Sequence, residues 1–232
     1  MDKRPSIIGK MFDRIAPTYD LLNKILSFSL DKAWRRAAVN LLEIRDGDAV
    51  LDIATGTGDL AIPAARRGGN VIGIDLSRKM LLRALGKAGE QDLRMRYSVV
   101  QGDALSMPFR DETFNSAMVA FGIRNMDSLD AFLAEICRVL SVHGRFSVLE
   151  FSMPESLFFR WIYGAYLTHV VPIIGGLISG DYDAYRYLRD SVAGFPAPRE
   201  LEDMMEGQGF RVVQSMPVFW GISHLYLIEK QG

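Results

Sequence analysis

A glycine-rich turn between an expected strand and an expected helix constrains the fold of this chain most. An apolar run at residues 48–53, DAVLDI, leads through ATGTG into residues 58–68, where apolar residues recur at helical spacing. Gly56, Gly58 and Ala61 match the G-x-G-x-x-G/A pattern, in which a strand passes into a helix around a bound nucleotide. We therefore expect a strand, a tight turn and a helix whose N-terminus is directed at a ligand.

Strand-like and helix-like segments alternate along the rest of the chain. The strand-like runs after the turn cover residues 70–75, 96–103, 114–122, 144–151, 210–219 and 221–230. The helix-like runs cover residues 77–89, with Ser77 as a candidate N-cap, 128–140 and 198–209. Alternating strands and helices form parallel sheets that are covered on both faces, but no helical pattern separates the last two strands. The sequence thus predicts an α/β fold, a Rossmann-like, doubly wound, mostly parallel seven-stranded sheet with an antiparallel last strand.

Two further segments are expected to be helical and to cover the sheet. With 232 residues, 49% hydrophobic and 24% charged, the chain has the profile of a folded domain with a large core, and we predict one domain over residues 1–232. Residues 1–45 are predicted to form an N-terminal cap and residues 152–196 a lid inserted after the fifth strand. Ligands of open parallel sheets bind beyond the carboxyl ends of the strands, so these two segments are well placed to roof that crevice.

Charge, cysteine and histidine content exclude several classes of partner. The 27 basic and 28 acidic residues give a formal charge of -1, so no global field attracts nucleic acid. The single cysteine, Cys137, cannot form an internal disulfide, and three widely separated histidines offer no metal-ligand spacing. The sequence therefore predicts no metal and no nucleic-acid partner, and a reducing cytoplasm fits best.

One apolar segment, residues 157–178, is long enough to be considered as a membrane span of roughly 20 residues. Arg160, His169, Pro172 and the pair Gly175–Gly176 argue against a span, because a cation, a helix breaker and a flexible pair would leave backbone groups unsatisfied in lipid. We expect a buried or membrane-skimming lid instead.

Acids at three successive strand ends indicate which cofactor the turn holds. Asp52 precedes the glycines, where its carboxylate is expected to repel the diphosphate of a dinucleotide and to favour the ammonium and sulfonium of S-adenosylmethionine. Asp75 closes the second strand, where its carboxylate is suited to accept hydrogen bonds from ribose hydroxyls. Asp103 closes the third strand, where its carboxylate is suited to accept a hydrogen bond from the adenine amine. A nicotinamide oxidoreductase with the same glycine pattern remains the alternative.

Motifs along most of the chain carry a more specific resemblance. They include YDLLNKILSFSLDKAWRR near the N-terminus, VLDIATGTGDL, GIDLSRKML, FGIRNM at residues 121–126 and YRYLRDSVAGFP. With these motifs the chain resembles the class I S-adenosylmethionine-dependent methyltransferases, and most closely the UbiE/MenG family of C-methyltransferases of menaquinone and ubiquinone biosynthesis. The resemblance implies S-adenosyl-L-methionine as cofactor and a prenylated quinol, met at the membrane surface, as substrate.

The turn, the strand-end acids and the resemblance together nominate site residues. The residues expected to bind the cofactor are Asp52, Ala54, Thr55, Gly56, Thr57, Gly58, Asp75, Leu76, Asp103, Ala104 and Ala120. The residues expected to bind the substrate are Tyr19, Asn23, Trp34, Phe121, Asn125, Tyr182, Tyr185 and Arg186, of which the last three are spaced to face a crevice.

Departures from the family pattern leave the substrate open. This chain has Asp31 where the family usually has histidine, Leu22 where it has methionine and Ala120 where it has serine. Residues 141–144 are SVHG in place of the family's K-P-G-G. These departures leave open whether the substrate is a naphthoquinol or a benzoquinol. Two alternative functions also stay open: a related methyltransferase with another small-molecule substrate, and an accessory protein that binds the cofactor without catalysing a reaction. The oligomeric state stays open between a monomer and a homodimer. The protein is expected in the cytoplasm or peripheral to the inner face of the membrane.

Methylation of a ring carbon requires a phenolate next to it, because the charge of the phenolate spreads onto that carbon. The substrate must therefore be the reduced quinol, and the site must remove a proton with an ordinary pKa near 10 or stabilise the anion. Arg124 is the cation expected to stabilise the phenolate, with a structural ion pair as the alternative. Asp20 is the first candidate for the base, followed by Asp31 and His169.

Overall fold

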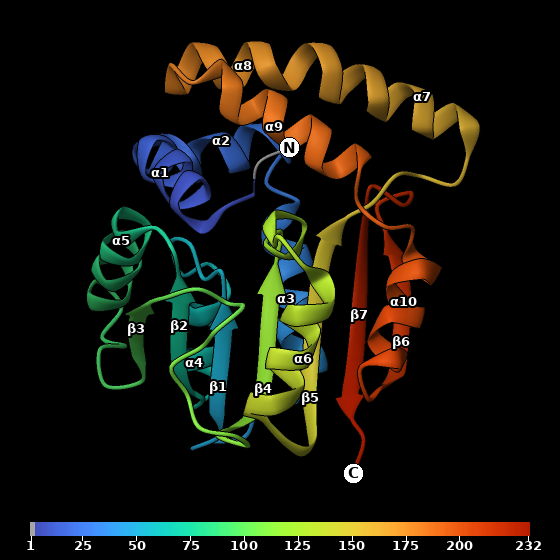
Figure 1. Cartoon of the computed structure of the whole chain (residues 1–232). Helices are drawn as coiled ribbons and strands as arrows, with labels where there is room; N and C mark the ends of the chain where they lie inside the picture. The colour runs from blue at the N-terminus through green and yellow to red at the C-terminus, as the bar shows by residue number, and fades with distance from the viewer. Residues whose placement is uncertain (1–2) are drawn as a thin grey trace.

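A twisted seven-stranded sheet forms the centre of the molecule (Figure 1). The computed structural model describes residues 3–232, and the first two residues of the expected cap lie outside them. The strand order is β3-β2-β1-β4-β5-β7-β6. The strands are β1 (Ala49–Ile53), β2 (Asn70–Asp75), β3 (Tyr97–Gln101), β4 (Phe114–Ala120), β5 (Leu140–Phe151), β6 (Phe210–Val218) and β7 (Ser223–Lys230). β7 runs antiparallel to both neighbours and the other pairs are parallel, which confirms the predicted topology.

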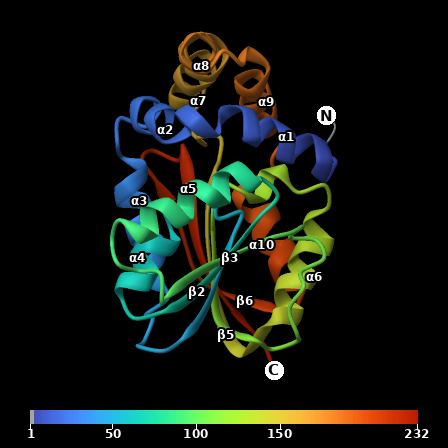
Figure 2. The ribbon, with the colours of Figure 1, turned by 90° about the vertical axis from the view of Figure 1, so that its left-hand side faces the viewer.

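Helices cover both faces of the sheet, as Figure 2 shows edge-on. One face carries α3 (Asp31–Leu41), α4 (Ala61–Arg66) and α5 (Arg78–Gly89), which bury alanines such as Ala38, Ala61 and Ala84 against it. The other carries α6 (Leu129–Val139) and α10 (Pro198–Gly207), which bury larger side chains, among them Phe132 and Met205. The small residues let helices on the first face lie close to the strands that carry the glycine turn.

The cap and the lid lie together over the carboxyl ends of the parallel strands, at the top of Figure 1. The cap consists of α1 (Pro5–Ile15), the 3-10 turn η1 (Ala16–Thr18) and α2 (Tyr19–Leu26). The lid consists of α7 (Leu157–Ala165), the π-helical turn η3 (Tyr166–Val170), α8 (Val171–Ser179) and α9 (Tyr182–Ala193). A third apolar cluster, which includes Leu22, Tyr163 and Tyr185, joins cap and lid to each other. The lid and the predicted cap up to Leu26 therefore form one roof, whereas α3, in the rest of the predicted cap, packs on a face of the sheet.

The lid contains one unbroken helix from Leu157 to Ser179. By length and composition this helix could cross a membrane, with a mean hydropathy of 1.4, and 33% of its apolar window is buried. The expectation that Gly175 and Gly176 form a flexible interruption is wrong. A Cβ on Gly175 would lie 2.3 Å from the ring of Tyr185, and one on Gly176 would lie 2.2 Å from the ring of Tyr182. The glycine pair instead allows the rings of α9 to contact the backbone of α8.

Helix ends and strand starts follow local chemistry. Ser77 accepts a hydrogen bond from the backbone N–H of Met80 at 3.2 Å, which confirms it as the N-cap of α5. β5 begins at Leu140, four residues before its predicted start, and its register with β4 shifts between Phe114 and Ser116. The bulge absorbs the SVHG segment, where His143 has a positive φ of 61°.

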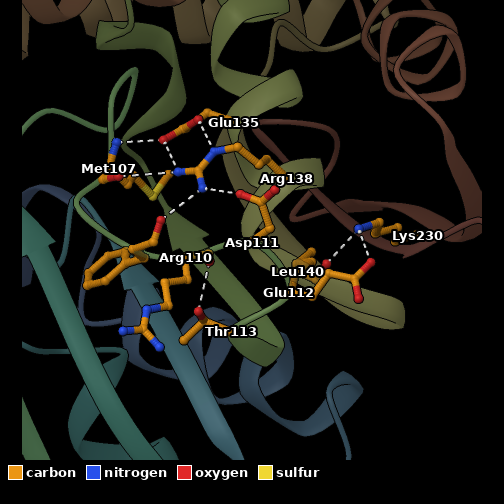
Figure 3. A network of polar contacts seen from close by, with 10 residues as sticks. Met107, Arg110, Asp111, Glu112, Thr113, Glu135, Arg138, Leu140 and Lys230 are labelled. Atoms are coloured by element: carbon orange, nitrogen blue, oxygen red, sulfur yellow. Dashed lines mark hydrogen bonds and ion pairs between the residues drawn. The ribbon is translucent and has the colours of Figure 1, made fainter.

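A polar network holds the long loop between β3 and β4, which carries Asp103 (Figure 3). Arg138 on α6 donates to the Phe109 carbonyl at 2.8 Å and to Asp111 at 2.7 Å. Glu135 pairs with Arg138 at 2.7 Å and accepts from the backbone N–H of Met107 at 2.6 Å. These hydrogen bonds lower the pKa of Glu135 and raise the pKa of Arg138, so both stay charged and fix the loop.

Candidate active site

Two adjoining cavities lie between the strand ends and the roof. The first, here called the turn cavity, has about 60 Å³ and lies against the glycine turn. The second, here called the lid cavity, has about 350 Å³ and lies between cap, lid and the ends of β4 and β5. Phe12, Tyr19 and Phe121 line both cavities. These three rings therefore form the wall between the two spaces.

The glycine turn adopts a conformation that its sequence permits. Gly56 and Gly58 have positive φ angles of 55° and 82°, and Ala54 shares this region at 49°. A Cβ on Gly58 would lie 3.2 Å from the Cβ of Ala84, so the missing side chain also lets the turn approach α5. Gly56 lines the turn cavity, where the missing side chain lets a ligand approach the backbone closely.

Hydrogen-bond acceptors are the main polar groups of the turn cavity. Asp75 accepts from the backbone N–H groups of Gly56 at 2.9 Å and Ser77 at 2.8 Å. Burial raises the pKa of Asp75 to about 6, although these hydrogen bonds act in the opposite direction. Asp103 lines the same cavity, and the buried Oδ1 of Asn125 has no hydrogen-bond partner among residues 3–232. The cavity can thus receive hydroxyl and amino groups.

Asp52 does not line this cavity, so its direct effect on a ligand stays a prediction. Its carboxylate is buried beneath the turn, where Thr55 Oγ1 donates a hydrogen bond to it. Burial raises the pKa of Asp52 to about 7, while the Thr55 hydrogen bond and the charge of Arg35 lower it. The acids that line the turn cavity are Asp75 and Asp103.

Asp20 fastens the cap to the glycine turn. It accepts a hydrogen bond from Thr57 Oγ1 at 2.6 Å and pairs with Lys87 Nζ at 3.2 Å. Lys87 also contacts Thr57 Oγ1 at 3.1 Å and forms an ion pair with Asp59. Asp20 lines neither cavity, and its predicted role as a base stays a prediction.

The lid cavity is apolar apart from a few buried groups. The charged residues among its lining are Asp31, Arg35 and Arg124. Arg124 Nη1 donates to Glu150 Oε1 at 2.9 Å, and its guanidinium lies 5.2 Å from the centre of the Phe151 ring. Arg124 Nε is buried without a hydrogen-bond partner in the described part of the chain. Arg124 therefore forms the structural ion pair and also keeps one unpaired donor among the described residues.

Comparison with known proteins fits this arrangement. The sequence profile of the ubiE/COQ5 methyltransferase family matches residues 1–228. The chain belongs to this family. It is 44% identical over 222 residues to a demethylmenaquinone methyltransferase of Thermus thermophilus, covering 95% of this chain and 100% of that protein. It is 47% identical over 227 residues to a ubiquinone/menaquinone biosynthesis C-methyltransferase UbiE of Syntrophotalea carbinolica, covering 97% and 92% of the two chains.

Solved structures share the fold of this ubiE/COQ5 family member at low identity. The [4+2]-cyclase SpnF superposes with a TM-score of 0.71 and 17% identity over 97% of this chain and 96% of that chain. A methyltransferase described as a possible histamine N-methyltransferase from Thermotoga maritima gives 0.66 and 20%, covering 96% and 99%. Both support the fold assignment.

Seven of the predicted cofactor residues line the turn cavity of this methyltransferase. They are Ala54, Gly56, Asp75, Leu76, Asp103, Ala104 and Ala120. The other four, Asp52, Thr55, Thr57 and Gly58, support the turn from behind or fasten the cap, and lie outside the cavity lining.

The predicted substrate residues divide in a similar way. Five of them line the lid cavity, namely Tyr19, Asn23, Trp34, Phe121 and Tyr185. The other three do not line the lid cavity, and their contact with the substrate stays a prediction: Asn125 lines the turn cavity, Tyr182 packs on Gly176, and Arg186 pairs with Asp183 in solvent. Of the three candidate bases, Asp31 lines the lid cavity, whereas His169 lies exposed on the lid and lines neither cavity.

Several lining residues were not predicted from the sequence. Arg35 stands in the quoted WRR run, but nothing in that pattern shows that its guanidinium is buried 5.1 Å from the centre of the Phe121 ring. Tyr187 follows the predicted Tyr185 by two positions, and its buried hydroxyl has no partner among residues 3–232. Phe28 and Trp220 line the lid cavity and are also 79% and 65% exposed, so they mark its mouth. Their exposure depends on tertiary structure that spacing does not reveal.

Proposed function

We propose that this chain is an S-adenosylmethionine-dependent C-methyltransferase that methylates a ring carbon of a prenylated quinol. The observation that carries the proposal is the pair of cavities, since a polar one at the glycine turn and an apolar one beneath the lid share the wall of Phe12, Tyr19 and Phe121. The turn cavity is assigned to the cofactor and the lid cavity to the quinol. The family and the names of the relatives support the reaction.

The residues of the turn cavity fit S-adenosylmethionine better than a dinucleotide. Asp75 and Asp103 supply acceptors for ribose hydroxyls and an amine, and Asn125 Oδ1 has no other partner among the described residues. The described lining contains no lysine or arginine to meet a diphosphate, whereas its two acids favour a cationic ligand. The sequence analysis expected a carboxylate to repel a diphosphate and to favour a cationic ligand, and Asp75 and Asp103, in place of Asp52, are the acids that line the cavity.

The cap has to move when the cofactor enters. The turn cavity has about 60 Å³, far below the roughly 300 to 1,000 Å³ of typical small-molecule sites. Phe12 and Tyr19 of the cap occupy part of this space, and the contacts of Asp20 with Thr57 and Lys87 close it. Release of these contacts opens the site, and their return shields the reacting groups from water.

The chain's own residues activate the substrate. When bound, the cofactor supplies an electrophilic methyl group on a sulfonium. Arg124 places a buried positive charge in the lid cavity, where it stabilises the negative charge of a quinol that loses a proton. The apolar lining strengthens this interaction because it excludes water. Tyr19 and Phe121, which line both cavities, position the ring next to the methyl donor.

The mouth of the lid cavity suits a substrate with a prenyl tail. Phe28 and Trp220 at the mouth adjoin a lid helix whose outer face exposes Leu157, Phe158 and Trp161. An exposed apolar surface of this kind is typical of a contact with a partner or a membrane. Lys24 and Arg36 lie exposed in the cap and α3, and neither forms an ion pair with another residue between positions 3 and 232. We therefore infer that this face docks on an anionic bilayer, from which the tail passes into the cavity.

Transfer of label tests the reaction. The protein is incubated with methyl-labelled S-adenosylmethionine and a reduced demethylated quinol, and label is expected on the ring carbon. Arg124→Met should lower kcat by about 10²-fold or more, as loss of a buried transition-state donor does, while affinity for S-adenosylhomocysteine stays within a factor of two. No label in any reduced quinol from the wild-type protein would refute the proposed reaction.

Vesicle binding tests the docking face. Trp161→Ser together with Phe28→Ser should reduce sedimentation with anionic phospholipid vesicles and slow methylation of a long-chain quinol in those vesicles. Methylation of a short-chain quinol in solution should change little. Met95→Ser is the matched control, because Met95 is 93% exposed and lies between α5 and β3, away from the lid. Equal effects of the control and the double variant would contradict the assignment.

A further inference from the structure

We infer that Asp31 is the catalytic base that takes the proton from the quinol hydroxyl; this assignment rests on the proposed function. The reaction needs a proton acceptor in the lid cavity, because the ring carbon becomes nucleophilic only when the neighbouring hydroxyl loses its proton. Asp31 supplies the one carboxylate among the described lining residues of that cavity. It lies in the first turn of α3 and is 6% exposed.

The hydrogen bonds of Asp31 leave one oxygen available. Its Oδ1 accepts from Ser27 Oγ at 2.7 Å, which fixes the orientation of the carboxylate. Its Oδ2 lies 3.6 Å from Arg35 Nε, a distance that gives charge compensation but no hydrogen bond. Oδ2 therefore has free lone pairs that can accept a proton.

A hydroxyl group finds a complementary donor beside this acceptor. Asn23 precedes Ser27 by one helical turn, lines the lid cavity and buries an Nδ2 group that has no partner within residues 3–232. A quinol hydroxyl both donates one hydrogen bond and accepts others. The geometry lets Asp31 receive the proton while Asn23 Nδ2 donates to the hydroxyl oxygen.

The other candidates for the base are excluded by their surroundings. Asp20 is held by Thr57 and Lys87 outside the cavity, and His169 lies in solvent. Tyr163 and Tyr187 line the cavity, but burial raises the pKa of both phenols, so they remain protonated at neutral pH.

The proton balance defines what Asp31 does. The O–H bond of the hydroxyl beside the acceptor carbon breaks, its proton moves to Asp31 Oδ2, and the electron pair spreads onto that carbon. After the carbon has gained its methyl group, it loses its own hydrogen as a proton and the ring becomes aromatic again. Asp31 then returns its proton to the oxygen. One proton is released for each methyl group, and Asp31 ends ionised as it began.

An ordinary carboxylate is a much weaker base than a phenolate, so transfer to Asp31 needs assistance. The difference in pKa is about six units for the free groups. Arg124 decreases this pKa difference, because its buried positive charge faces the same cavity and lowers the pKa of the quinol hydroxyl. Asp31 and Arg124 therefore act on the same ionisation, one by accepting the proton and the other by stabilising the charge left behind.

Two variants test the assignment with a reduced short-chain quinol. Asp31→Asn keeps the shape and the Ser27 hydrogen bond but cannot accept the proton, so kcat should fall by about 10²- to 10⁴-fold. Affinity for S-adenosylhomocysteine, measured by calorimetry, should stay within a factor of two. Asp31→His should keep partial activity, and its pH profile should lose activity below about pH 6.5, where an ordinary imidazole becomes protonated.

The outcomes separate this inference from the proposed function. A kcat of Asp31→Asn within about threefold of the wild type, or an Asp31→His profile equal to that of the wild type, would overturn the role of Asp31. If Asp31→Asn also loses cofactor affinity, the pH profile of Asp31→His decides. Ser27→Ala should lower kcat less than Asp31→Asn, because it loosens the carboxylate without removing it. Failure of the wild-type protein to methylate any reduced quinol would instead refute the proposed function.

Discussion

Removal of the Glu150 carboxylate should expose how much the buried ion pair at the active site contributes to stability. Glu150 is almost fully buried and accepts hydrogen bonds from Arg124 Nη1 at 2.9 Å, the backbone N–H of Arg124 at 3.2 Å and that of Phe151 at 2.8 Å. Glu150→Ala leaves the guanidinium of Arg124 buried without its counter-charge. Loss of one partner from such a pair costs about 3 to 5 kcal/mol.

This cost should appear as a lower unfolding free energy in urea titrations followed by circular dichroism. For a chain of this size each kcal/mol lowers Tm by about 2 to 4 °C, so Tm should fall by about 6 to 20 °C. The double variant Arg124→Met/Glu150→Leu removes both charges and should recover most of the stability, because well-packed apolar residues can replace a buried pair. It should remain inactive, since the cation of the lid cavity is absent.

A double-mutant cycle of Arg124→Met and Glu150→Leu separates the effect of the ion pair on stability from its effect on catalysis. The single variants Arg124→Met and Glu150→Leu complete the cycle, and a coupling energy of more than about 1 kcal/mol is expected for side chains in direct contact. The reasoning would be refuted if Glu150→Ala cost less than about 1 kcal/mol, or if the double variant were as unstable as the sum of the two single variants.

Two other predictions concern a buried acid and the packing of the lid. Burial raises the pKa of Asp52 to about 7 and the pKa of Asp75 to about 6, both from 3.8. The stability that the two protonated carboxyl groups contribute is therefore complete below about pH 4 and is lost as the pH rises through these raised pKa values. Asp52→Asn should therefore flatten the decline of the unfolding free energy between about pH 5 and pH 8 in urea titrations, and an unchanged slope would speak against the buried charge. Gly175→Ala should cost about 1 to 3 kcal/mol and speed proteolysis of the lid, because its Cβ would lie 2.3 Å from the Tyr185 ring. Gly164→Ala on the same helix meets no atom within 4 Å and should be neutral or stabilise by up to about 1 kcal/mol; equal losses from both variants would contradict the packing argument.

The topology of the sheet was predictable because it depends on local signals. The period of the apolar residues, the turn at Gly56 and Gly58 and the cap at Ser77 each act within a few residues, and they agree with one another. The absence of a helix pattern before the last strand was enough to predict its antiparallel direction.

The direction of individual side chains was harder to predict. Asp52 stands at the expected place in the sequence but points beneath the turn, because Thr55 and Arg35 satisfy its charge there. Tyr182 and Tyr185 lie on one helix, yet Tyr182 packs on the backbone of α8 while Tyr185 reaches the cavity. The direction of Asp52 depends on Arg35 in α3, and that of the two tyrosines depends on the approach of α8 and α9, and residue spacing reveals neither contact.

The cap and the partition between the two cavities have a consequence for turnover. Phe12 and Tyr19 belong to the cap and border both chambers, so a cap that swings away to discharge the spent cofactor also uncovers the quinol. Exchange of the cofactor is then linked to exchange of the quinol, and the methylated product can leave each time the cofactor is replaced. Under the proposed cap movement, the two chambers therefore open together.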